Sequence, residues 1–197
     1  MSSPGGVEND AGIIGGSLDD PERFSEIFDR HAPHIQRYLA RRLGREIADD
    51  LVGETFLIAF GKRHRYDTKY PDARPWLYGI ATTLVAQHRR EEAREYRLRA
   101  AVPPQVAEES HAERVAAQVT AQAMNGMLAS ALAGISQGDR DVLLLIAWER
   151  LAYEEVAAAL AIPVGTVRSR LSRARKKLRI ALGQADNTTS GEVSNHG

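Results

Sequence analysis

The stretch between Val164 and Leu182 carries seven basic side chains and no acidic one. On a helical wheel its apolar residues fall on one narrow arc, the pattern of an amphipathic helix with one buried seam. The seam residues are Val167, Leu171, Ala174, Leu178, Ala181 and Leu182, and the bases are Arg168, Arg170, Arg173, Arg175, Lys176, Lys177 and Arg179. A continuous positive face of this kind suits a polyanion such as nucleic acid. Because charged helix faces are more often merely solvated, this helix alone leaves both interpretations open.

A second short amphipathic helix is predicted from Tyr153 to Leu160, joined to the basic helix by the tight turn Ala161–Gly165. Pro163 ends the first helix, because the residue before a proline is pushed out of the helical region. Two helices joined in this way form a helix-turn-helix, whose second helix enters the DNA major groove. The wheel makes Arg168, Ser169, Ser172 and Arg173 candidates for reading base edges, and Arg170, Lys176, Lys177 and Arg179 candidates for phosphate contact.

The whole segment LAYEEVAAALAIPVGTVRSRLSRARKKL resembles region 4 of the extracytoplasmic-function (ECF, group IV) sigma factors of the sigma-70 family, which recognise bacterial promoters. The resemblance implies contact with the minus-thirty-five element through Thr166, Arg168, Ser169, Arg170, Ser172, Arg173, Lys176 and Lys177. Two positions depart from the family pattern: Ala152 replaces a capping Ser or Thr, and Ala161 replaces the usual glycine of the turn. An alanine held in the left-handed conformation would cost about 1 kcal/mol.

A further helix is predicted from Glu46 to Phe60, with large apolar groups placed among acids outside its core face. Such a face suits a protein partner with a basic rim, and it could equally be covered by another helix of the same chain. By resemblance, its ADDLVGETF motif matches the region 2 helix that grips the clamp helices of RNA polymerase. The implied polymerase-binding residues are Asp49, Asp50, Glu54, Leu57 and Phe60.

In the loop GKRHRYDTKYPDAR, residues 61 to 74, basic residues alternate with two tyrosines. Proteins hold single-stranded DNA with basic side chains, which contact the phosphates, and with aromatic rings, which stack on the unpaired nucleobases. A merely solvated loop has a similar composition. The family resemblance implies that this loop and the next helix read and open the minus-ten element. The candidates are Lys62, Arg63, Arg65, Tyr66, Lys69 and Tyr70. Trp76, at core spacing in the next helix, is interpreted as a packing residue.

No segment of the sequence predicts a strand, so we expect an all-α fold of two small helical domains joined by a flexible linker. The predicted organisation is a disordered tail over 1–20, a region 2 domain over 21–99, a linker over 100–111, a region 4 domain over 112–182 and a flexible tail over 183–197. Within the first domain, Pro33 is expected to kink or split the helix that begins at Pro21. Ser136 is expected to cap a helix with Asp139 in its first turn.

The amino-acid composition and the distribution of charge limit the classes of function that the chain can have. The 26 basic and 26 acidic residues cancel, but residues 21–100 and 139–182 each carry a net charge of +4, so two basic blocks alternate with acidic connectors. There is no cysteine, no long apolar run and no signal peptide, which predicts a cytoplasmic protein without membrane insertion. His31 and His34 could hold a metal only with a further ligand, and we expect no catalytic residue, no cofactor and no metal.

The resemblance implies core RNA polymerase, promoter DNA and an anti-sigma factor as partners. Two alternatives remain: a stand-alone helix-turn-helix regulator, and an interaction module whose basic helix docks on an acidic protein. Binding to core polymerase without DNA separates a sigma factor from both.

Overall fold

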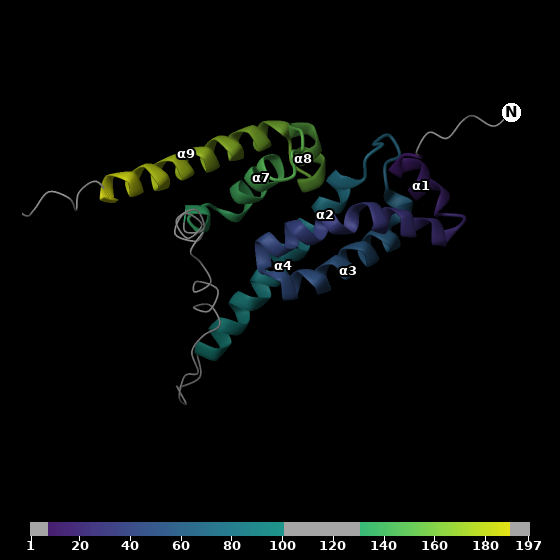
Figure 1. Cartoon of the computed structure of the whole chain (residues 1–197), viewed down its shortest axis with the longest axis horizontal. Coiled ribbons are helices and arrows are strands. Elements are labelled where there is room, and N and C mark those ends of the chain that lie inside the picture. Colours follow the sequence, from purple (N-terminus) through teal and green to yellow (C-terminus); the bar gives the residue numbers. More distant parts are fainter. Residues whose placement is uncertain (1–7, 101–130, 190–197) are drawn as a thin grey trace, which may run out of the picture. The chain divides into compact units, whose positions relative to one another are not determined.

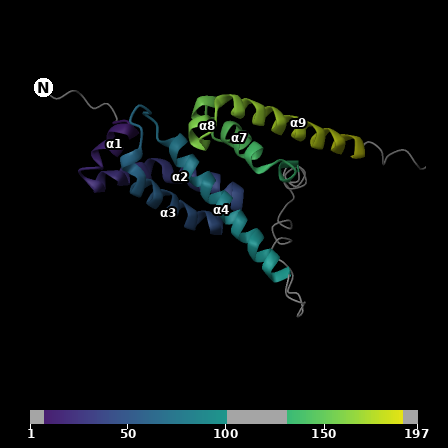
Figure 2. The same ribbon diagram turned by 180° about the vertical axis from the view of Figure 1, so that it is seen from behind.

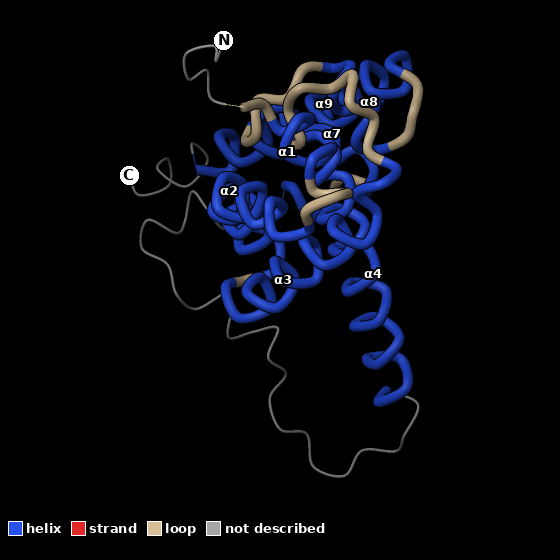
Figure 3. The backbone as a smooth tube through the Cα atoms, turned by 90° about the vertical axis from the view of Figure 1, so that its right-hand side faces the viewer, coloured by secondary structure: helices blue, strands red, loops and turns tan. Residues whose placement is uncertain are grey.

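The computed structural model describes residues 8–100 and 131–189, and these residues form helices and connecting loops without a strand (Figure 3). The predicted all-α fold is therefore confirmed for the described part of the chain. In the first stretch the helices are α1 (Asp10–Gly16), the 3₁₀ helix η1 (Pro21–Phe24), α2 (Ser25–Leu43), α3 (Arg45–Lys62), the 3₁₀ helix η2 (Arg63–Arg65) and α4 (Arg74–Ala100). In the second they are α7 (Gln137–Ala147), α8 (Tyr153–Leu160) and α9 (Val164–Thr189) (Figure 1).

The described residues divide into two compact units. One contains the chain up to Glu91 together with Glu154–Ile162, and the other contains Glu92–Tyr153 and the chain from Pro163 onward. Residues 101–130, which include nearly all of the predicted linker and the beginning of the predicted region 4 domain, lie outside the described residues. None of the described helices is long and apolar enough to cross a membrane.

The core of the first unit forms between α2, α3 and α4. Gly44 alone joins α2 to α3 with φ +88°, a conformation that favours glycine, and the two helices lie side by side (Figures 1 and 2). The Tyr38 ring of α2 packs edge-on against Tyr78 of α4, with centroids 5.3 Å apart. The Tyr38 hydroxyl lies 2.7 Å from that of Thr82 and accepts a hydrogen bond from Arg42 Nη1. These polar groups satisfy one another inside the core, as buried polar groups must.

Two expectations about this fold were wrong, and a third was wrong in part. Residues 10–16 were expected to be disordered but form α1, because Ile13 and Ile14 are fully buried and Asn9 Oδ1 caps the helix by accepting a hydrogen bond from the Gly12 N–H. Pro33 lies inside α2 and does not split it, since the packed face of the helix continues on both sides of the proline. Helix α9 continues to Thr189, seven residues beyond the predicted end at 182.

The second unit is built on the packing of α7 against α9. The Ser136 hydroxyl accepts a hydrogen bond from the Asp139 N–H at the start of α7, so the predicted cap is confirmed. Val142 and Leu145 are fully buried on α7, and Val167 and Ala174 are fully buried on α9. This packing buries the first half of the apolar seam of α9, at Val167, Leu171 and Ala174, and leaves most of the basic side chains of α9 exposed.

Candidate nucleic-acid and protein interfaces

The basic face of α9 is open to solvent at most of the predicted positions. Thr166 and Arg170 are half-buried, and the other predicted residues are exposed, namely Arg168, Ser169, Ser172, Arg173, Lys176 and Lys177. Among the described residues, Arg168, Ser172 and Lys176 have neither an ion pair nor a side-chain hydrogen bond. The positive charges of Arg168 and Lys176 therefore remain available to an external polyanion.

One edge of this face is held by the beginning of α7. Arg173 donates to both carboxylate oxygens of Asp139, from Nη2 at 2.8 Å and from Nε at 3.2 Å. Asp139 is 5% exposed, and the Arg173 guanidinium holds the pKa of this carboxyl below its ordinary value despite the opposing effect of burial. Arg170 lies over Gly138, where an added Cβ would come within 2.8 Å of Nη1, and Lys177 Nζ is 3.5 Å from the Gly134 carbonyl oxygen. This edge therefore braces α9 against α7.

The turn between α8 and α9 has the geometry that its sequence predicts. Ala161 has φ +51°, the left-handed conformation expected where the family pattern has glycine. The Ile162 N–H donates to the Ala157 carbonyl, and the Pro163 carbonyl accepts from the N–H groups of Thr166 and Val167 at 2.8 and 3.2 Å. These bonds satisfy backbone groups on both sides of the turn, so the alanine is accommodated with its strain.

The predicted minus-ten residues, which run from the last residue of α3 through the loop that follows, are of two kinds. Lys62, Arg65, Lys69 and Tyr70 are exposed, with Tyr70 at 51%. Arg63, by contrast, donates to the carbonyls of Ser17 at 3.2 Å and Phe60 at 2.7 Å, and its guanidinium lies 3.9 Å from the centre of the Phe60 ring.

The Tyr66 side chain is also engaged in contacts within the protein. Its hydroxyl donates to the Tyr70 carbonyl at 2.6 Å, and its ring packs on Trp76 with centroids 5.0 Å apart. Burial and the nearby carboxylates of Asp10, Asp72 and Asp67 raise the pKa of Tyr66. Tyr66 and Trp76 thus support the loop together, in line with the prediction that Trp76 is a packing residue.

The predicted protein-binding face of α3 is exposed over most of its length. Asp50, Glu54 and Leu57 follow one another at helical spacing, and Leu57 is 73% exposed. Asp49 is exposed too, and its Oδ1 accepts a hydrogen bond from Gln36 at 2.9 Å. Phe60 is half-buried against Phe24, with ring centroids 5.5 Å apart, so it is only partly available to a partner.

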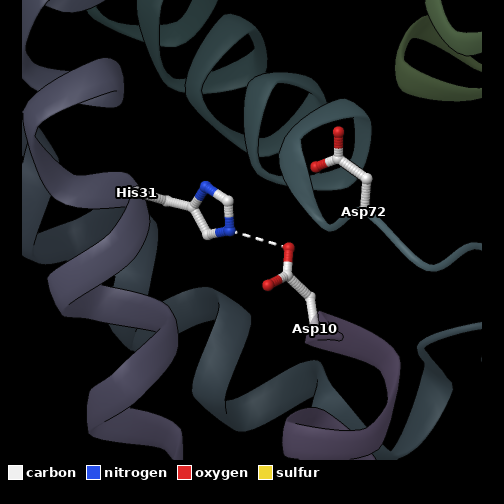
Figure 4. A group of neighbouring side chains, drawn as sticks. All are labelled: Asp10, His31 and Asp72. Atoms are coloured by element: carbon white, nitrogen blue, oxygen red, sulfur yellow. Dashed lines mark hydrogen bonds and ion pairs between the residues drawn. The ribbon is translucent and has the colours of Figure 1, made fainter. Parts of the chain in front are cut away.

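Sequence reasoning missed a cluster formed by Asp10, His31 and Asp72, whose ligand-type atoms lie within 4.8 Å of one another (Figure 4). Asp10 Oδ2 is 2.7 Å from His31 Nε2 and accepts the Ala73 N–H at 2.9 Å, and Oδ1 accepts from Arg30 at 3.2 Å. Both oxygens of Asp72 accept from Arg74. Because these oxygens already have donors, the cluster fits a hydrogen-bond network better than a cation site.

The two predicted histidines do not converge: His34 Nδ1 is 2.7 Å from Arg37 Nη2, while His31 turns to Asp10. The partner of His31 was missed because α1 was expected to be disordered, although Asn9 and Asp10 have the residue types of a helix cap and first turn.

Comparison with known proteins agrees with this arrangement. Family models match twice: sigma-70 region 2 over residues 27–95 and sigma-70 region 4 over residues 125–178. The chain is 36% identical to the ECF RNA polymerase sigma factor SigC of Mycobacterium tuberculosis (strain CDC 1551 / Oshkosh) over 144 residues, which cover 72% of this chain and 73% of SigC. It is 30% identical to the RNA polymerase sigma factor CarQ of Myxococcus xanthus over 172 residues, covering 84% and 92%.

Two solved structures share the fold at 24% identity. The sigma factor RpoE, in complex with the anti-sigma factor NepR from Bartonella quintana, matches with a TM-score of 0.60 over 81% of this chain and 96% of RpoE. CnrH, in complex with the cytosolic domain of CnrY, matches with a TM-score of 0.61 over 89% and 97%. On the strength of the sequence matches, the chain belongs to the sigma-70 family of RNA polymerase sigma factors, within its extracytoplasmic-function group.

Proposed function

We propose that this chain binds core RNA polymerase and directs promoter-specific initiation of transcription, without catalysing a reaction itself. The observation that carries the proposal is the presence of two complementary surfaces in one chain. On α3, Leu57 is 73% exposed and is surrounded by acidic side chains. On α9, basic side chains without an ion pair are exposed on the side opposite the buried apolar residues. A stand-alone helix-turn-helix regulator needs only the second of these surfaces.

On the minus-thirty-five element, α9 enters the major groove with its N-terminal half. Arg168, Ser169 and Ser172 read base edges and Lys176 contacts phosphate, since these side chains are exposed and point away from the seam. Arg173 approaches DNA while bound to Asp139, with its Nη1 free of hydrogen bonds among the described residues. Arg170 and Lys177 contact phosphates from the braced edge of the helix, and Thr166 lies at the helix start.

On the minus-ten element, the exposed residues of the loop after α3 contact the separated strand. Lys62, Arg65 and Lys69 follow phosphates and Tyr70 stacks on an unpaired base. Arg63 and Tyr66 support the loop from beneath rather than touching DNA directly, because their polar groups and rings are already engaged. This division of the six predicted residues can be tested by substitution.

On the polymerase, Asp49, Asp50, Glu54 and Leu57 form the contact surface, with Phe60 at its margin. We assign residues 21–99 to the polymerase-binding and minus-ten domain, extended by α1, and residues 112–182 to the minus-thirty-five domain. An anti-sigma factor, as in the complex of RpoE with NepR, would regulate the chain in the cytoplasm, where polymerase acts.

The discriminating experiment is a pull-down of purified core RNA polymerase by the full chain in the absence of DNA. A sigma factor retains core polymerase at stoichiometric levels and loses it when Leu57 and Glu54 are both changed to alanine. Failure of the wild-type chain to bind core polymerase would reject the proposal in favour of a stand-alone regulator.

A further inference from the structure

Helix α1 touches both ends of the loop that carries the proposed minus-ten residues. At its start, the Asp10 N–H donates to the Pro71 carbonyl at 3.1 Å, where the loop ends. Just after its last residue, the Ser17 carbonyl accepts from Arg63 Nε at 3.2 Å, where the loop begins. One short helix therefore bridges the two ends of residues 63–73.

The Asp10 side chain adds a second contact between α1 and the end of the loop. Its carboxylate is buried between α2 and the start of α4, where it accepts the Ala73 N–H and lies against His31 Nε2 (Figure 4). Burial would raise the pKa of Asp10, but the hydrogen bonds from His31 and Ala73 bring it below the ordinary value. Because a buried carboxylate is costly without donors, these bonds hold Ala73, and with it the end of the loop, in one position.

Apart from its contacts with α1, the loop is held by the packing of Tyr66 on Trp76 and by the hydrogen bond from Arg63 to the Phe60 carbonyl. Lys69 and Tyr70 are exposed, and the internal bond from the Tyr66 hydroxyl to the Tyr70 carbonyl fixes the loop only to itself. Helix α1, in contrast, is anchored by Ile13 and Ile14, which are 0% and 1% exposed. Helix α1 is thus fixed by its buried side chains, and it holds the loop of residues 63–73, whose Lys69 and Tyr70 side chains face solvent.

We propose that α1 is a clasp that sets the conformation of residues 63–73, and that Asp10 is a positioning residue for recognition of the minus-ten element. This inference rests on the proposed function of the loop. Asp10 acts through Ala73 and Pro71 and does not itself contact DNA.

The first test is amide hydrogen exchange of the full chain without DNA. Asp10→Ala removes the acceptor of the Ala73 N–H, so exchange of the peptide covering residues 66–73 should become about tenfold faster, while that of α3 is unchanged. Glu8→Ala is the matched control, because Glu8 pairs through its side chain with Arg23 at the exposed outside of the same segment and does not touch the loop. Equal exchange of residues 66–73 in wild type and Asp10→Ala would overturn the clasp.

The second test measures promoter selectivity with core RNA polymerase. Its readout is the run-off yield from a promoter selected from a library, divided by the yield from that promoter with its minus-ten element scrambled. Asp10→Ala should lower this ratio about tenfold at unchanged affinity for core polymerase, and Glu8→Ala should leave it at the wild-type value. An equal loss on both templates, or a parallel loss of polymerase binding, would reduce Asp10 to a general stabilising residue and refute the positioning role. If the wild-type chain itself shows no dependence on the minus-ten element, the proposed function fails, and hydrogen exchange still decides whether the clasp exists.

Discussion

Leu57 provides the sharpest prediction about the polymerase-binding face. Its side chain is 73% exposed, so its truncation removes almost no packing from the free protein. Fully burying a leucine side chain is worth about 1.5–3 kcal/mol, and roughly three quarters of that burial remains to be gained when a partner covers this one. Leu57→Ala should therefore weaken binding to core polymerase by about 1–2 kcal/mol, which is about 5- to 30-fold in Kd.

The assay is titration of core RNA polymerase with fluorescently labelled full-length chain in the absence of DNA. Leu18→Ala is the matched control, because Leu18 is also an exposed leucine, at 50%, but lies outside α3. Both variants should unfold at the wild-type temperature, since neither side chain belongs to the core. Equal Kd values for wild type and Leu57→Ala would refute the assignment of this face, and an equal loss for both leucine variants would show that the effect is not specific to α3.

Three further predictions concern the turn, the braced edge of α9 and the loop. Ala161→Gly should stabilise the chain by about 1 kcal/mol in urea unfolding, because it relieves the strain of φ +51°. Ala158→Gly, at an exposed position within α8, should destabilise the chain by about 1 kcal/mol. Asp139→Asn should lower the melting temperature at pH 7. The Arg173 guanidinium lowers the pKa of Asp139 below its ordinary value of 3.8, so the ion pair stabilises the fold fully above pH 3.8. The difference from wild type should shrink as the pH falls through the folded pKa, and a difference that did not shrink as the pH is lowered from 3.8 would contradict this. Tyr70→Ala should reduce permanganate reactivity of the minus-ten thymines in complexes with polymerase, with unchanged melting temperature, whereas Tyr66→Ala should lower the melting temperature as well.

The elements with strong local patterns were predictable from the sequence. The seam of α9 repeats at helical spacing, and the structure buries Val167, Leu171 and Ala174 as that spacing requires. The cap at Ser136 and the left-handed conformation of Ala161 also follow from residue types within a few positions along the chain. In each case the information that determines the structure is local.

The features that sequence did not predict depend on distant partners. Helix α1 contains three glycines and is weak in isolation, and it forms because other elements bury Ile13 and Ile14. The contacts of Asp10 with His31 and Ala73 span 21 and 63 residues, a separation that no periodicity reveals. The pairing of Arg173 with Asp139, 34 residues away, was likewise invisible to a helical wheel, which treats each helix as if it stood alone.

The most direct test of the account is run-off transcription by core RNA polymerase on a library of promoters, with and without the full-length chain. We predict that the chain confers initiation on a subset of templates that share two sequence elements, one upstream and one at the melted region. Arg168→Ala should abolish selection of the upstream element while initiation from pre-opened templates continues. Initiation that does not depend on the added chain, or that selects no common sequence, would contradict the central claim.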